Sequence, residues 1–236
     1  TSSNEQSSTQ ESAVAGIQLG TADVGEVDED GLAGGIVGGP GDAAGNATSV
    51  VGASLHLNFG SLGTSGATIS FQSLQPGLAG LTSGGEPVNI LVTTVGGVPT
   101  LIGFVGNDPN TAGSHVFEVT LGLTTITGEY SFTLLRPLDH PDLGTEDTTA
   151  LVFRYEVTNA AGTVTPTFTV NVNDDSPEPV NIATTMSEND TTVVVATLAG
   201  DFHPGADGLR SVTLDSTHAP TITGPDGVVL AIPNLT

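Results

Sequence analysis

Hydrophobic and polar residues alternate along much of residues 48–172, which is the pattern of β-strands with one buried and one solvent-facing side. The clearest runs are 151–157 and 164–172, joined by a short loop that ends in Gly162. Glycine there supplies the positive φ that a hairpin loop needs. Similar runs predict further strands at 12–20, 55–59, 67–74, 87–95, 117–121 and 130–134.

Many short strands at this spacing, with no convincing helical stretch, predict an all-β fold. The expected architecture is an immunoglobulin-like antiparallel β-sandwich. The inward positions of the alternating runs give its predicted core: Leu55, Leu57, Phe59, Phe117, Val119, Tyr130, Phe132, Leu134, Phe153, Tyr155, Phe168 and Val170. By contrast, we expect the acidic segment 23–30 and the glycine-rich segment 31–46 to form loops.

An internal repeat divides the chain. Residues 48–71 recur at 191–214, shifted by 143 positions, with identities such as Val50 and Val193 or Phe59 and Phe202. Repetition at a fixed period is typical of modular structural proteins. The predicted domains are a tail at 1–24, a complete sandwich repeat at 25–178 and an incomplete second repeat at 179–236, with the proline-rich stretch 173–179 as the boundary.

The second repeat lacks counterparts of the strands in 114–172. A partial sandwich leaves unpaired strand edges, so we expect 179–236 to pair with β structure from elsewhere, such as another copy of the chain. The predicted strand at 12–20 precedes its own repeat and is a candidate for donation to a neighbour. The expected partners are therefore neighbouring repeats or other copies.

Composition excludes several classes of function. The chain has 26 acidic residues, three arginines and no lysine, for a formal net charge of −23. Nucleic-acid binding requires a basic surface, and an anionic membrane surface would repel this chain. No apolar run has transmembrane length. The absence of cysteine excludes disulfides and thiolate metal sites.

Clustered carboxylates suit calcium, which takes six to eight oxygen ligands. Asp28 and Asp30 stand at the start of the repeat, and Asp174 and Asp175 stand at its end. In a tandem array the end of one module meets the start of the next, so these four residues are the candidate calcium ligands. The alternative is a set of solvated linker carboxylates.

A second polar cluster lies in LDHPDLGTED, residues 138–147, around His140. A zinc or catalytic site would need another histidine or a nucleophile nearby. We therefore interpret the segment as a structured loop with, at most, a local cation site, and we expect no enzyme activity. Tyr130 and Tyr155 are in register with core phenylalanines, so we expect them to be buried rather than to stack on sugars.

Several segments together resemble the repeat, of roughly 143 residues, of giant bacterial adhesins exported by type I secretion. They are VDEDGL (27–32), NFG (58–60), YSFTLLRPLDHP (130–141), LVFRYEVTNAAG (151–162) and TFTVNVNDDSP (167–177). The resemblance implies a stalk of tandem β domains at the cell surface or in a biofilm matrix, often stiffened by calcium. The hairpin NAAG departs from the more acidic turn of such repeats.

The sequence thus predicts a non-catalytic, extracellular structural or adhesive repeat module of a bacterial surface or biofilm-matrix protein. One alternative is a fibre subunit that assembles by strand donation. Another is a carbohydrate-binding module, against which the absence of tryptophan counts.

Overall fold

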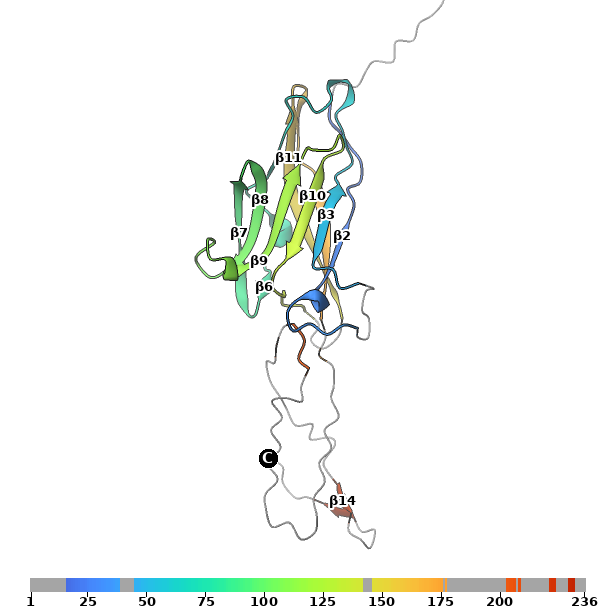
Figure 1. Cartoon of the computed structure of the whole chain (residues 1–236), viewed down its shortest axis with the longest axis vertical. Helices are drawn as coiled ribbons and strands as arrows, with labels where there is room; N and C mark the ends of the chain where they lie inside the picture. Colours follow the sequence, from blue (N-terminus) through green and yellow to red (C-terminus); the bar gives the residue numbers. More distant parts are fainter. Residues whose placement is uncertain are drawn as a thin grey trace, which may run out of the picture.

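The computed structural model describes residues 16–38, 45–141, 146–175, 177, 203–206, 208, 221–223 and 229–231. Two β-sheets pack face to face and form a sandwich (Figure 1). Within the described ranges the helical elements are short 3-10 turns: η1 (Glu29–Gly31), η2 (Gly60–Leu62), η3 (Pro76–Leu78) and η4 (Ala112–Ser114). The predicted all-β sandwich is confirmed.

The first sheet has six strands and is antiparallel throughout. Its order is β3 (Ser49–Ser54), β10 (Glu129–Leu134), β9 (His115–Gly122), β8 (Val98–Val105), β7 (Glu86–Val95) and β6 (Thr82–Ser83). The sequence pattern did not predict β8, because β8 is buried on both faces and therefore shows no alternation.

The second sheet is built around the long strand β11 (Thr148–Asn159). β11 pairs with β12 (Gly162–Val164) near its C-terminal end and with β13 (Thr167–Asn173) over most of the rest of its length. β5 (Thr68–Phe71) also pairs with β11, and β2 (Gly25–Asp28) pairs with β13. β2 runs parallel to β13, while the other pairings of the sheet are antiparallel. The expectation that 23–30 is a loop is therefore wrong for β2, whose Val27 is buried against the core.

All twelve predicted core residues are buried, each at 3% exposure or less. Aromatic rings connect the two sheets through the middle of the core. The ring centroids of Phe117 and Phe153 are 6.0 Å apart, and those of Tyr130 and Phe168 are 4.1 Å apart. The Tyr130 hydroxyl donates a hydrogen bond to the Asp23 carbonyl oxygen, so the buried polar atom of this ring has a partner.

The N-terminal segment packs on its own repeat where it is described. β1 (Gln18–Leu19) pairs with β4 (Leu57–Asn58), and the Gly20 amide donates to the His56 carbonyl oxygen at 2.9 Å. The predicted strand at 12–20 is thus only two residues long here, and residues 12–15 lie outside the described ranges.

Most of the second repeat, including nearly all of 191–214, also lies outside the described ranges. Its described strands are β14 (Thr221–Thr223) and β15 (Val229–Ala231), which pair with each other. Among the helices in the described ranges, none is both long and apolar enough to cross a membrane.

Replacement of Phe132 or Phe153 by alanine tests the assigned core. Both side chains are 0% exposed, so each truncation should lower the free energy of unfolding by about 3–5 kcal/mol in a urea titration. The control is Val51→Ala, because Val51 is 84% exposed and its truncation should change stability by less than about 0.5 kcal/mol. Unfolding of the phenylalanine variants at the parent's urea concentration would show that the faces are wrongly assigned.

Candidate metal centre

The parallel pairing of β2 and β13 brings the two acidic ends of the repeat together. Its register places Asp28 opposite Asn173, so the residues that follow each strand emerge at the same end of the sandwich. Asp28, Asp30, Asp174 and Asp175 all lie at that end, and each is only 3–4% exposed. Figure 1 shows η1, in blue, at this end, which we call the acidic end.

The acidic end therefore forms within one repeat. The sequence predicted that the acidic residues at the end of one module meet those at the start of the next module. In the structure the four aspartates instead come together within the first repeat. The parallel β2–β13 pairing, which the sequence pattern does not reveal, is the physical reason. The second repeat lacks the glycine-rich insertion of 31–46, and the acidic residues at its start, Glu188 and Asp190 with Asn189, lie outside the described residues.

Local hydrogen bonds fix the aspartates at the start of the repeat. Asp28 is the N-cap of η1, and its Oδ1 accepts a hydrogen bond from the Asp30 amide at 2.9 Å. Asp30 Oδ2 accepts from the Gly38 amide at 3.0 Å. Its other oxygen, Oδ1, is buried and accepts no hydrogen bond from the described residues. That oxygen is available to a ligand at the acidic end.

The glycine-rich segment after η1 folds closely around these carboxylates. A Cβ atom on Gly35 would lie 2.3 Å from the Asp30 carbonyl oxygen, and one on Gly31 would lie 2.2 Å from the Asn46 carbonyl oxygen. Only glycine permits such an approach. The glycines thus let the backbone amides of Ile36 and Gly38 reach Asp175 and Asp30. The sequence predicted only that this segment is a loop.

Asp175 connects three parts of the chain. Its carboxylate accepts hydrogen bonds from the Ile36 amide, at 3.2 Å to Oδ2, and from the Ala206 amide, at 2.5 Å. Ile36 follows η1, and Ala206 belongs to the second repeat. Burial raises the pKa of Asp175; the two amide hydrogen bonds oppose this rise, and the charges of Asp30 and Glu146 add to it.

Two further residues complete the acidic end. Glu29 is 0% exposed, and its Oε1 accepts a hydrogen bond from the Leu138 amide at 2.8 Å. His140 Nε2 lies 3.4 Å from the same oxygen, and His140 Nδ1 lies 2.9 Å from Asp147 Oδ1. Ligand atoms of Glu29, His140 and Asp174 all lie within 4.8 Å of one another.

The surroundings of His140 favour its protonated, positively charged form. Burial alone lowers its pKa, but the hydrogen bond to Glu29 and the charges of Glu29, Asp174 and Asp147 raise it to about 9. A protonated imidazole acts as a counter-ion, and a metal ion could use His140 as a ligand only by displacing its proton. The carboxylate oxygens around His140 are hard donors, which suit calcium.

The sequence predicted the four aspartates as ligands, with Glu29 beside them and His140 in a possible local cation site, but not that Glu29 and His140 lie together. The signals were present, since Glu29 lies inside VDED and His140 inside LDHPDLGTED. Their proximity depends on the position of the 138–147 segment beside η1, which no local pattern encodes. Asp142 lies outside the described residues, and Asp139 accepts a hydrogen bond from the Gly85 amide.

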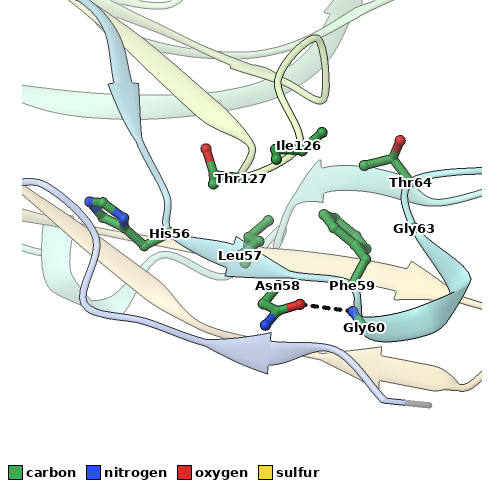
Figure 2. Close-up of a pocket in the computed structure, with 9 residues that line it drawn as sticks. All are labelled: His56, Leu57, Asn58, Phe59, Gly60, Gly63, Thr64, Ile126 and Thr127. Carbon is green, nitrogen blue, oxygen red and sulfur yellow. Dashed lines mark hydrogen bonds between the residues drawn. The ribbon is translucent and has the colours of Figure 1, made fainter. Parts of the chain in front are cut away.

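A separate hollow lies at the opposite end of the sandwich, with a volume of about 560 Å³ (Figure 2). Leu57 and Phe59 line it together with Thr64, Ile126 and Thr127. Its one titratable lining residue, His56, pairs with Asp23 at 2.9 Å. The other residues that line this hollow carry no charge.

Comparison of this chain with protein-family models, with curated proteins and with solved structures finds no match.

The raised pKa of His140 predicts a specific pH dependence of stability. The ordinary pKa of 6.5 applies to the unfolded chain, and about 9 applies to the folded protein. The stabilisation is therefore fully present below pH 6.5 and is lost as pH rises through 9, by up to about 3 kcal/mol. Urea unfolding at intervals from pH 6 to 9.5, with chelator present, should show this decline.

In the His140→Gln variant the stability should fall much less between pH 6 and 9.5, because glutamine does not titrate. The His56→Gln variant should keep the decline, since His56 is partly exposed and lies at the other end of the sandwich. A decline of equal size in both variants would show that His140 is not the titrating group.

Proposed function

We propose that this chain is a non-catalytic structural repeat module of a bacterial surface or biofilm-matrix adhesin, and that its acidic end binds calcium at the junction between successive repeats. Three observations support the proposal: the internal repeat at a shift of 143 residues, the β-sandwich fold, and the position of the acidic end where the chain leaves the first repeat. An extracellular location is part of the proposal.

The observation that carries the metal part is the burial of five carboxylate side chains at one place. Asp28, Glu29, Asp30, Asp174 and Asp175 are each at most 4% exposed. Transfer of ionised carboxylates out of water is costly unless opposite charges compensate. His140 contributes one positive charge, and backbone amides contribute hydrogen bonds. A calcium ion would supply two more charges and accept the hard oxygen ligands that the cluster offers.

The contacts of Asp175 explain how such an ion would affect the junction. Asp175 is the last residue of the acidic end, and its carboxylate is already shared between Ile36 of the first repeat and Ala206 of the second. Gly205, with a φ of +79°, lies so close that an added Cβ would be 3.0 Å from Asp175 Oδ2. An ion bound at Asp175 would hold the first repeat and the segment 203–206 together, which would stiffen a tandem stalk.

The burial of the polar cluster also supports a role without catalysis. The His140 side chain is 2% exposed and Glu29 is 0% exposed, so a substrate has no access to them. Tyr130 and Tyr155 are buried in the core, as the sequence predicted, and so do not form an exposed sugar-stacking surface.

Calcium titration tests the metal site. Calorimetry should show binding heat, and the melting temperature should rise with calcium concentration and fall with chelator, because the ion binds only the folded state. At a free concentration 100 times the dissociation constant, the added stability should be about 2.7 kcal/mol. Asp28→Asn and Asp175→Asn should weaken the effect, and Glu86→Gln, at an exposed site on β7, should not.

Absence of binding heat, together with a melting temperature indifferent to chelator, would remove calcium from this account. An equal loss of binding in the Glu86→Gln variant would show that the response reflects overall charge rather than this site.

Small-angle X-ray scattering tests the proposed role of the junction. Calcium should restrict movement between the first repeat and residues 179–236, because the ion would tie Asp175 to both parts. For the parent chain, the distribution of the radius of gyration should be narrower in calcium than in chelator. For Asp175→Asn, calcium should not narrow this distribution. Identical scattering of the parent under both conditions would contradict a stiffening role.

A further inference from the structure

The outer edge of β7 is a long strand edge with little cover from the described residues. β6 pairs only with Glu86 and Pro87, and one more hydrogen bond joins the Val88 amide to the Leu81 carbonyl oxygen at 2.9 Å. Beyond Val88, β7 continues for seven residues to Val95, paired on its other side with β8. Figure 1 shows β7 at the margin of the first sheet, with β6 near one end of the strand.

Strand geometry identifies the backbone groups on this edge. The Val88 amide points away from β8, because it bonds Leu81. Backbone groups alternate along a strand, so the N–H and C=O groups of Ile90, Val92 and Thr94 point the same way. Three residues therefore present donors and acceptors that can receive another strand.

Charge distinguishes this edge from the rest of the molecule. Residues 87–107 include no Asp, Glu, Lys, Arg or His, although the whole chain has a net charge of −23. Two copies of so acidic a protein repel each other over most of their surfaces. A second copy can approach along an uncharged segment with the least carboxylate–carboxylate repulsion.

The other sheet edges in the described part of the chain have features that oppose strand addition. β3 has an irregular register near Gly52, and Asp23 bonds the Ser54 amide at its end. β2 carries the charged residues Glu26 and Asp28. β5 is only four residues long. Bulges, charges and short length are the usual protection of edge strands, and β7 from Val88 to Val95 has none of them.

We propose that the β7 edge is a self-association surface, at which a second copy of this chain adds its own β7 in antiparallel orientation. A two-fold axis at Val92 would pair Ile90 of each copy with Thr94 of the other and use all three outward-facing residues. That arrangement forms about six main-chain hydrogen bonds, two for each residue pair. It joins the two six-stranded sheets into one continuous sheet and makes an isologous dimer.

This association is lateral and does not depend on the calcium junction. The acidic end joins successive repeats along one chain, whereas the β7 edge would join repeats of adjacent chains. Side chains on the outer face of β7 would meet across the dimer, among them Leu91, Thr93 and the 58%-exposed Val95. Stalks built from such modules would associate side by side.

Sedimentation velocity of the full chain over a concentration series, with chelator present, tests the proposal. The parent should form a concentration-dependent dimer that strengthens with added sodium chloride, because salt screens the repulsion between acidic copies. Thr93→Glu places a charge on the edge strand, and Thr94→Pro removes an outward N–H group. Each variant should raise the dissociation constant at least about tenfold while its melting temperature stays near that of the parent.

The matched control is Val51→Glu, which adds the same charge to β3, the opposite edge of the same sheet. It should leave the dimer unchanged. A parent that is monomeric throughout the series would overturn the proposal. So would a dimer that persists in both β7 variants, which would assign association to another segment, or a dimer that Val51→Glu weakens equally. Because chelator is present, these outcomes are independent of calcium binding.

Discussion

The parallel pairing of β2 with β13 is the interaction on which the rest of the structure depends. It attaches the start of the repeat to its last strand, with Val27 opposite Val172, and so fixes the edge of the second sheet. The same register places Asp28 opposite Asn173. The residues that follow each of them, Glu29 and Asp30 on one side and Asp174 and Asp175 on the other, are acidic. A slip by one residue would turn Val27 out of the core and Asp28 out of the acidic end, because side chains alternate along a strand.

This arrangement places hydrophobic packing and electrostatics in opposition. The core holds the two strands together, and the burial that stabilises Val27 also removes the neighbouring carboxylates from water. The protein compensates in part with the imidazolium of His140 and with amides from the glycine-rich segment, including those of Ile36 and Gly38. Glycine at 31 and 35 is needed because any side chain there would collide with backbone oxygens. This balance is the physical basis of the proposal that the acidic end binds a further cation.

The sequence predicted the parts of the fold that local patterns encode. The strict alternation at 151–157 and in 164–172 gave β11 and β13 with the correct buried faces, and all twelve proposed core residues are buried. It missed β8, where both faces are buried and alternation disappears, and it missed β2, whose charged sequence becomes a strand only through its distant partner. The four aspartates were identified from chemistry, whereas the neighbourhood of Glu29 and His140 depends on contacts between residues over a hundred positions apart.

The most direct test of the central claim is a high-resolution crystal structure of this chain, from crystals grown in the presence of calcium. The account predicts an ion at the acidic end, with oxygens from the carboxylates of Asp28, Asp30, Asp174 or Asp175 at about 2.3–2.6 Å and His140 outside its coordination shell. A well-ordered acidic end with water in place of an ion, at calcium concentrations in the millimolar range typical of extracellular modules, would contradict the account.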